Sequence, residues 1–166
     1  MSILEAVEAF IEGMEWDDEV ESDSESGYCR LSTKLEVAEQ VFDLEVFGDA
    51  KGERLVLCLT PPFRALDTRH GECCRLFNFL NDEYLYAGRI SLDEGGRIMY
   101  KEVHDTDDLE PEPAMLHNML NSGTIFFKRH IEAVAAVALT GKGFDDLVME
   151  YKRKEALKEA RNNRNS

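Results

Sequence analysis

The sequence lacks any long apolar run. Its longest uninterrupted one extends only from Ala133 to Leu139, whereas a membrane-spanning helix needs about 20 such residues. It also lacks a basic start followed by an apolar stretch, the pattern of a secretory signal peptide. We therefore expect a cytoplasmic protein that has no membrane partner.

Cysteine and basic residues are also scarce. In the cytoplasm the four cysteines stay reduced, so no disulfide framework is expected. The 19 Lys and Arg residues stand against 34 Asp and Glu residues and give a formal net charge of -15. Such a field repels phosphate backbones and attracts basic partners, which excludes nucleic acid as a partner and favours protein.

Motifs for metals and cofactors are missing as well. His70, Cys73 and Cys74 come nearest to a ligand cluster, but a structural zinc site needs four ligands and no second pair lies at ligand spacing. The acidic stretches lack the alternation and the glycine of a calcium loop. Gly95 and Gly96 suit a hairpin turn and form no phosphate-binding loop. We predict no metal and no cofactor.

One enzymatic alternative stays open, a small thiol-dependent enzyme that uses Cys73 or Cys74 as its nucleophile. Its histidine partner would be set by the fold and not by the order along the chain. Activation of a thiol needs a cationic neighbour or a helix amino terminus, and the surrounding charge is strongly negative. The prediction is therefore that the chain is no enzyme.

The chain begins with an amphipathic helix and an acidic break. Ser2 and Glu5 form a capping box, and an apolar stripe at helical spacing then runs to Met14. Between Glu15 and Glu25 there are seven acids and no base. Because such a segment buries little apolar area, we expect residues 15–27 to be a mobile linker. The helix would then dock on its own domain or on a neighbour.

A period of two predicts strands at 28–37, 42–46 and 55–59. The third run is apolar on both faces, which is typical of a central strand. A helix follows, with an apolar stripe from Cys73 to Tyr84. Two more strands, at 86–93 and 98–103, are joined by a tight hairpin at Glu94–Gly96.

Two helices close the chain. Apolar residues at steps of three and four continue from Leu116 to Ala138 and predict one long helix, before Gly141 and Gly143 interrupt the pattern. A last helix starts at Phe144, and residues 152–166 contain six basic residues against two acidic ones. We predict a single domain at 1–143 and a helical extension at 144–166, whose basic end frays or meets another chain.

The predicted fold class is α+β, an antiparallel sheet of about five strands with helices packed on one face, in the order α-βββ-α-ββ-α-α. Helices on one face leave the other to a partner, a second copy or water. We expect protein contacts on an outer face of the sheet or on the long helix. The residues predicted to make them are Leu31, Leu35, Phe42 and Leu44 on the sheet, and Met119 and Phe126 on the helix.

The stretch RLFNFLNDEYLYAGRISLDEGGRIMYKEVH, residues 75–104, contains a helix end with Asn78 and Asn81, followed by the hairpin at Asp93–Gly96. With the order of elements, it resembles the YbjN family of bacterial sensory transduction regulators, whose fold is similar to type III secretion chaperones. The resemblance implies a non-enzymatic, protein-binding homodimer that acts as a regulator or chaperone-like adaptor, or alternatively as a type III secretion-type chaperone for a specific client. The helix after Gly143 departs from the minimal chaperone pattern.

Overall fold

The computed structural model describes residues 1–107 and 109–162. Its centre is one six-stranded sheet in the order β1-β2-β3-β4-β6-β5, in which every neighbouring pair is antiparallel. The strands are β1 (Glu21–Asp23), β2 (Tyr28–Val37), β3 (Gln40–Asp49), β4 (Arg54–Thr60), β5 (Arg89–Leu92) and β6 (Ile98–Asp105). The predicted antiparallel sheet is confirmed, with one strand more than expected, and β4 is central.

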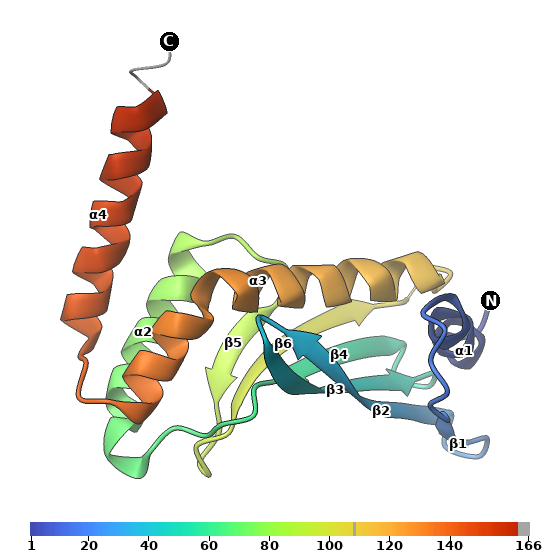
Figure 1. Cartoon of the computed structure of the whole chain (residues 1–166). Helices are drawn as coiled ribbons and strands as arrows, with labels where there is room; N and C mark the ends of the chain where they lie inside the picture. Colours follow the sequence, from blue (N-terminus) through green and yellow to red (C-terminus); the bar gives the residue numbers. More distant parts are fainter. Residues whose placement is uncertain (108, 163–166) are drawn as a thin grey trace.

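Four helices accompany the sheet, which confirms the α+β class. Figure 1 shows α3 lying across one face of the sheet, with α1 at one end and α2 at the other. The helices are α1 (Ile3–Gly13), α2 (His70–Glu83, preceded by the 3-10 turn η1 at Asp67–Arg69), α3 (Pro113–Leu139) and α4 (Phe144–Asn162). The prediction of a single long helix for α3 is confirmed.

The core lies between the sheet and the helices. Alternate residues of β2, β3, β4 and β6 point toward the helices and are buried, among them Leu31, Leu44, Leu57 and Tyr100. They pack against the apolar stripe of α3 and against the buried side of α2. No helix of the described residues covers the opposite face of the sheet (Figure 1).

The acidic segment at 15–27 is not the mobile linker that its composition predicts. Glu21–Asp23 forms β1 and pairs with β2, and Trp16 and Val20 pack against the core. The preceding helix approaches the sheet so closely that a Cβ added at Gly48 would overlap with Cγ2 of Ile3. The prediction is wrong here because a few apolar side chains and a backbone ladder are enough to fix a short acidic segment.

The last helix differs from the others, because it leaves the domain. Figure 1 shows α4 rising away from the sheet on the side that carries α3. Leu147 is its one buried residue among those described. In the described part of the chain, no helix combines the length and the apolar character that a bilayer crossing requires.

Candidate functional site

The residues predicted to contact a partner lie in the core. Leu31, Phe42, Leu44, Met119 and Phe126 are all buried between the sheet and α3, and only Leu35, the sixth, is partly accessible. The prediction of an outer apolar face is therefore wrong for these positions. Alternation identifies residues that share a face of a strand but does not say which face the helices cover.

Three of the four thiols are buried. Cys73 is buried, and this burial raises the pKa of its thiol to about 11, so it stays protonated at neutral pH. Burial also raises the pKa of Cys29 and Cys58. Cys74 is exposed. Among residues 1–107 and 109–162, no group of three or more His, Cys, Asp or Glu side chains is placed to hold a metal ion.

The uncovered face of the sheet is mixed in character. Phe47, Val56 and Val103 face one another across β3, β4 and β6, and Val103 is 51% exposed. Beside them Glu45 receives hydrogen bonds from Arg30 and Arg97 at 2.6 and 2.7 Å. Charged and apolar side chains thus alternate on this face, which is compatible with water as its cover.

The charged group at the centre of that face is a carboxylate with two cations. Burial opposes ionisation of Glu45, but the hydrogen bonds from Arg30 and Arg97 outweigh this effect and hold the pKa of Glu45 below its ordinary value. The carboxylate is therefore ionised at neutral pH, and the three side chains bind one another.

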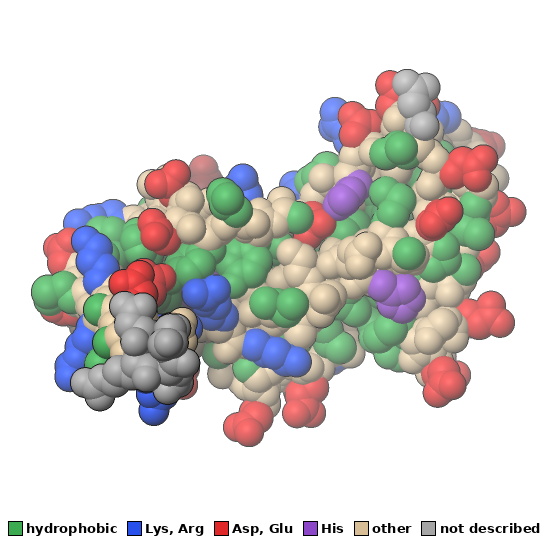
Figure 2. All heavy atoms as spheres, turned by 90° about the horizontal axis from the view of Figure 1, so that it is seen from above, with side chains coloured by type: hydrophobic (Ala, Val, Ile, Leu, Met, Phe, Trp, Pro, Cys, Tyr) green, Lys and Arg blue, Asp and Glu red, His purple; other side chains and the backbone are tan. Residues whose placement is uncertain are grey.

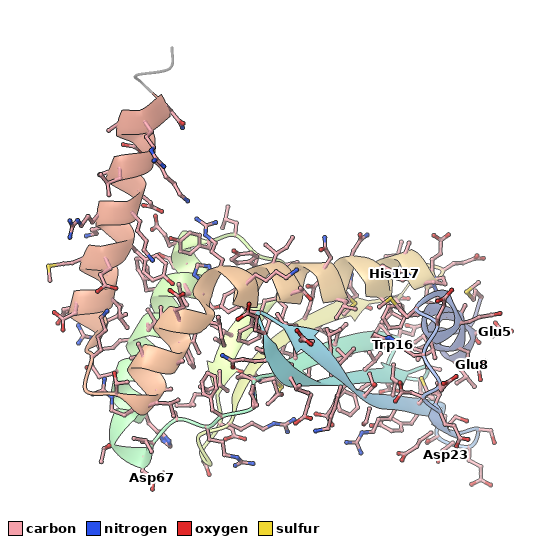
Figure 3. All side chains as sticks on the ribbon, viewed as in Figure 1. Glu5, Glu8, Trp16, Asp23, Asp67 and His117 are labelled. Carbon is pink, nitrogen blue, oxygen red and sulfur yellow. The ribbon has the colours of Figure 1, made fainter. Side chains whose placement is uncertain are left out.

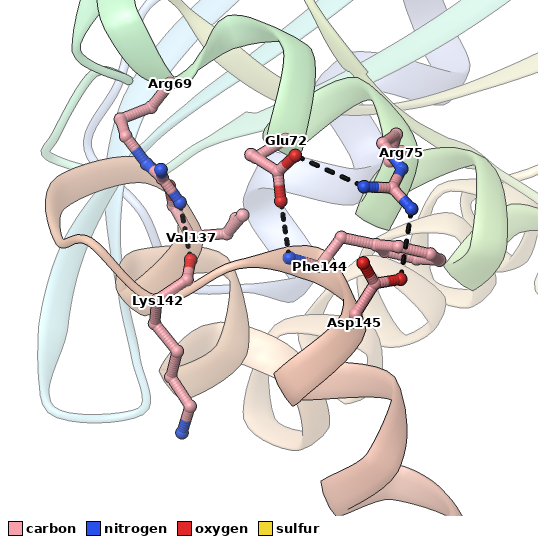
Figure 4. Close-up of polar contacts among 7 residues, drawn as sticks. All are labelled: Arg69, Glu72, Arg75, Val137, Lys142, Phe144 and Asp145. Carbon is pink, nitrogen blue, oxygen red and sulfur yellow. Dashed lines mark hydrogen bonds and ion pairs between the residues drawn. The ribbon is translucent and has the colours of Figure 1, made fainter.

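A latch of polar contacts fixes the start of α4 to α2 (Figure 4). The carboxylate of Glu72 accepts a hydrogen bond from the backbone N–H of Phe144 at 2.6 Å, which lowers the pKa of Glu72. Arg75 pairs with Asp145 at 3.0 Å and lies over the Phe144 ring. Arg69 donates to the backbone carbonyl of Val137 in the last turn of α3 and to that of Lys142 in the α3–α4 connection. These contacts set the direction in which α4 leaves the domain.

A buried histidine joins α3 to α4 farther along. His130 is fully buried, and its two ring nitrogens lie 2.8 Å from the hydroxyl of Tyr151 and 3.3 Å from that of Tyr86. Burial, with the charge of Arg129 as a smaller cause, lowers the pKa of His130 to about 4. The imidazole is thus neutral at neutral pH, and both nitrogens have hydroxyl partners.

A cleft opens between α3 and α4 where the two helices diverge. Its volume is about 260 Å³. Small and aromatic side chains form its floor, while charges of both signs surround it, and Arg129 stacks over Tyr84 at 4.4 Å. In the view along α4, apolar side chains are visible between this helix and the body of the molecule (Figure 2). The floor contains Tyr84, Ala133, Ala136, Leu147 and Tyr151, and the charged residues include Arg129, Glu132, Lys154, Glu155 and Lys158.

Two residues of this cleft could be singled out from the sequence pattern, but their meeting could not. Tyr84 and Tyr151 end the apolar stripes of two predicted helices, but 66 intervening positions hide that they meet, with ring centroids 6.0 Å apart. Nothing in the local pattern distinguishes Arg129 from other charged residues of α3. Another group that was missed is the buried Glu102, which contacts His104 at 2.8 Å and Tyr100 at 3.3 Å. Because the buried carboxylate of Glu102 has these two hydrogen-bond partners, we interpret this residue as part of the core and not as a binding site.

Several solved structures are similar to this chain. The HopA1-SchA chaperone-effector complex has 19% identity and a TM-score of 0.49, covering 76% of this chain and 89% of that one. The ExsC-ExsE complex has 19% identity and a TM-score of 0.46, covering 78% and 96%. The Yersinia pestis type III secretion chaperone SycH, in complex with a fragment of YscM2, has 12% identity and a TM-score of 0.47, covering 80% and 97%.

A search of the curated proteins gives no match to this chain. A family model does match: YbjN, described as "Putative bacterial sensory transduction regulator", covers residues 4–136. The matched range includes all six strands, α2 and most of α1 and α3, and α4 lies outside it. Since the match extends over most of the sequence and over the whole sheet, the chain belongs to the YbjN family.

Proposed function

We propose that the chain is a non-enzymatic, cytoplasmic adaptor of bacterial signalling that binds a segment of a partner protein in the cleft between α3 and α4. The cleft is the observation that supports this proposal. Tyr and Arg side chains supply a large share of the binding energy in protein interfaces, and here Tyr84, Tyr151 and Arg129 come together at one opening.

The size and chemistry of the cleft favour a polypeptide side chain over a cofactor. Its volume of about 260 Å³ lies below the range of roughly 300–1,000 Å³ that is typical of small-molecule pockets. The floor is apolar and the surrounding charges have both signs, so an apolar anchor side chain would enter while the flanking residues of its segment meet Lys154 or Glu155. The latch and the His130 contacts hold both walls in place before binding, which reduces the entropy that binding costs.

The proposal places the binding site between two parts of the chain. One wall belongs to the proposed YbjN domain at 1–143 and the other to the helical extension that begins at 144. The chain could not form this cleft without α4, so the extension is part of the functional unit. The basic residue Arg164 and its neighbours at 163–166 lie outside the described residues.

A photo-crosslinking experiment tests the proposal. Benzoylphenylalanine placed at Glu132, an exposed residue at the edge of the cleft, is expected to form a covalent adduct with a discrete partner protein in bacterial cells. The same group at Lys34, on the uncovered face of the sheet, is the control and should give no such adduct. Equal adducts at both positions, or no adduct at Glu132, would contradict the proposal.

A cleft-filling substitution identifies the site by another route. Ala136→Trp should weaken partner binding at least about tenfold, because the indole occupies the space of the anchor. Ile125→Trp is the matched control, since this residue of α3 is 48% exposed and does not line the cleft. Loss of binding in both variants would point away from the cleft.

Thiol labelling separates this function from the thiol-enzyme alternative. With its raised pKa, Cys73 should react with iodoacetamide far more slowly at pH 7 than a free thiol, and removal of Cys73 and Cys74 by alanine substitution should leave partner binding unchanged. Rapid labelling of Cys73 at neutral pH would favour the enzyme instead. The identity of the crosslinked proteins distinguishes a signalling adaptor from a type III secretion-type chaperone. A regulatory partner is expected for the adaptor, and secreted clients are expected for the chaperone.

A further inference from the structure

The outer end of α4 is an exposed, basic and partly apolar helix surface. Every described residue from Ala156 onward is exposed, and Leu157 is 59% exposed. One side of this end carries two apolar side chains among three basic ones. We call its residues the basic end: Lys154, Leu157, Lys158, Ala160 and Arg161. A helix end of this kind gains little stability by itself, so a second surface that covers Leu157 would stabilise it.

The opposite end of the molecule carries the complementary surface. Residues 1–29 contain ten acidic residues and no Lys or Arg. A groove with a volume of about 340 Å³ lies there between α1 and the segment that follows it. Its apolar residues are Ile11, Trp16 and Val20, and its acidic residues are Glu8, Glu12 and Asp18. We call this set the acidic groove. Figure 3 labels Glu8 and Trp16 at this end.

The acidic groove and the basic end match in both charge and apolar character. Lys and Arg residues flank Leu157 in the basic end, and carboxylates flank Trp16 in the acidic groove. Seen from above, Lys and Arg gather around α4 at the left of Figure 2, while Asp and Glu predominate at the other end of the molecule. Opposite charges of this kind steer association and fix which surfaces meet.

The two surfaces cannot meet within one molecule, since α1 and α4 stand at opposite ends of the sheet (Figure 1). We infer that the basic end of α4 in one copy docks into the acidic groove of a second copy. Because α4 rises on the same side of the sheet as α1 and α3, two copies related by a two-fold axis can face each other with these sides. In this arrangement α4 of each copy contacts α1 of the other, so the same contact is made twice and a closed dimer results.

The basic end shares Lys154 and Lys158 with the partner-binding cleft but also has residues of its own. Leu157 and Arg161 line the basic end and do not line the cleft, so substitutions there test dimerisation without entering the proposed partner site. A residue on the other side of the same helix provides the control. Lys152 and Arg161 are nine positions apart, which at 100° per residue places them on opposite faces of α4.

The experiment compares charge reversals on the full chain by sedimentation equilibrium at low salt. The wild type is expected to be a dimer, whose dissociation constant rises roughly tenfold with Arg161→Glu and also with Glu8→Lys combined with Glu12→Lys. Lys152→Glu should leave the dimer unchanged, as should Glu36→Lys combined with Glu94→Lys. The triple variant that carries both Arg161→Glu and the two α1 reversals should recover most of the lost affinity.

Trp16 provides an independent readout, because it is the one tryptophan of the chain. Its emission should shift to shorter wavelength as protein concentration rises through the dimer dissociation constant, and Arg161→Glu should move this shift to higher concentration. A wild type that stays monomeric at all concentrations overturns the inference, as does a dimer that Arg161→Glu and Lys152→Glu affect equally. Failure of the cleft substitutions to alter partner binding would leave this outcome unaffected.

Discussion

The helices at the two ends of the molecule, α1 and α4, are attached to the domain by different physical means. α1 has 11 residues, buries five of them and is capped by its own Ser2 and Glu5. α4 has 19 residues, buries only Leu147 and receives its cap from Glu72, a residue of α2. Apolar burial therefore fixes α1, whereas polar contacts fix the direction of α4 and leave most of its surface exposed.

The largest expected effect tests whether α1 belongs to the core. Phe10 is fully buried and makes edge-to-face contacts with Trp16 and His117. Phe10→Ala should lower the free energy of unfolding by about 3–5 kcal/mol, as measured by urea denaturation. Glu8→Ala, on the exposed side of the same helix, is the control and should change it by at most about 0.5 kcal/mol. A small effect of Phe10→Ala would mean that α1 is as loosely attached as α4.

The next effect concerns pH at the α4 end. Burial lowers the pKa of His130 from 6.5 to about 4. Between pH 4 and 6.5, this histidine is therefore protonated in the unfolded chain and neutral in the folded one. The stability from this site is therefore complete above pH 6.5 and decreases as the pH falls toward 4, by at most about 3 kcal/mol. Urea denaturation between pH 7 and 4 should show this loss. In His130→Gln, the loss of unfolding free energy between pH 7 and 4 should be smaller by that amount. If the variant loses as much stability as the wild type, His130 is not the cause of the pH dependence.

A smaller effect tests the cap of α1. Ser2 accepts a hydrogen bond from the backbone N–H of Glu5 at 3.2 Å, and Ser2→Ala should cost about 1 kcal/mol of unfolding free energy. Ser22→Ala, at an exposed position of β1, is the matched control. A cost no larger than that of Ser22→Ala would show that burial alone holds α1.

The smallest effect on the whole domain is expected from the latch of α4. Glu72→Gln removes the charge that accepts the Phe144 N–H and pairs with Arg75. Hydrogen exchange of the α4 amides should become roughly two- to tenfold faster, while the exchange of the α1 amides stays the same. If hydrogen exchange became faster in the amides of both helices, the latch would support the entire core. The two helices would then not be attached independently.

Much of the sheet could be predicted from sequence because its strands alternate with a period of two. The predicted runs at 28–37, 55–59 and 98–103 coincide with β2, β4 and β6, and Gly96 has the left-handed backbone that the predicted hairpin requires. The strand β1 was missed because its three residues are all polar and exposed. The turn between β2 and β3 was missed because Ala38 and Glu39 adopt positive φ angles without the usual Asn or Gly.

The candidate site could be predicted only in part. Helical stripes correctly identified Met119 and Phe126 as residues of one apolar face, but that face points to the sheet and not to a partner. The cleft requires Tyr84 from the end of α2, Arg129 from α3 and Tyr151 from α4. Local periodicity contains no information about which ends of separate helices meet.

The sequence alone determined the class of fold, the order of its elements, the excess of negative charge and the likeness to the YbjN family, since these depend on composition and on patterns within single segments. Tertiary structure alone decided that the acidic segment after α1 is held in place, that the leucines of β2 and β3 face inward, and that α4 stands out beside a cleft. These features depend on which surfaces exclude water together, and side chains distant along the chain determine that jointly.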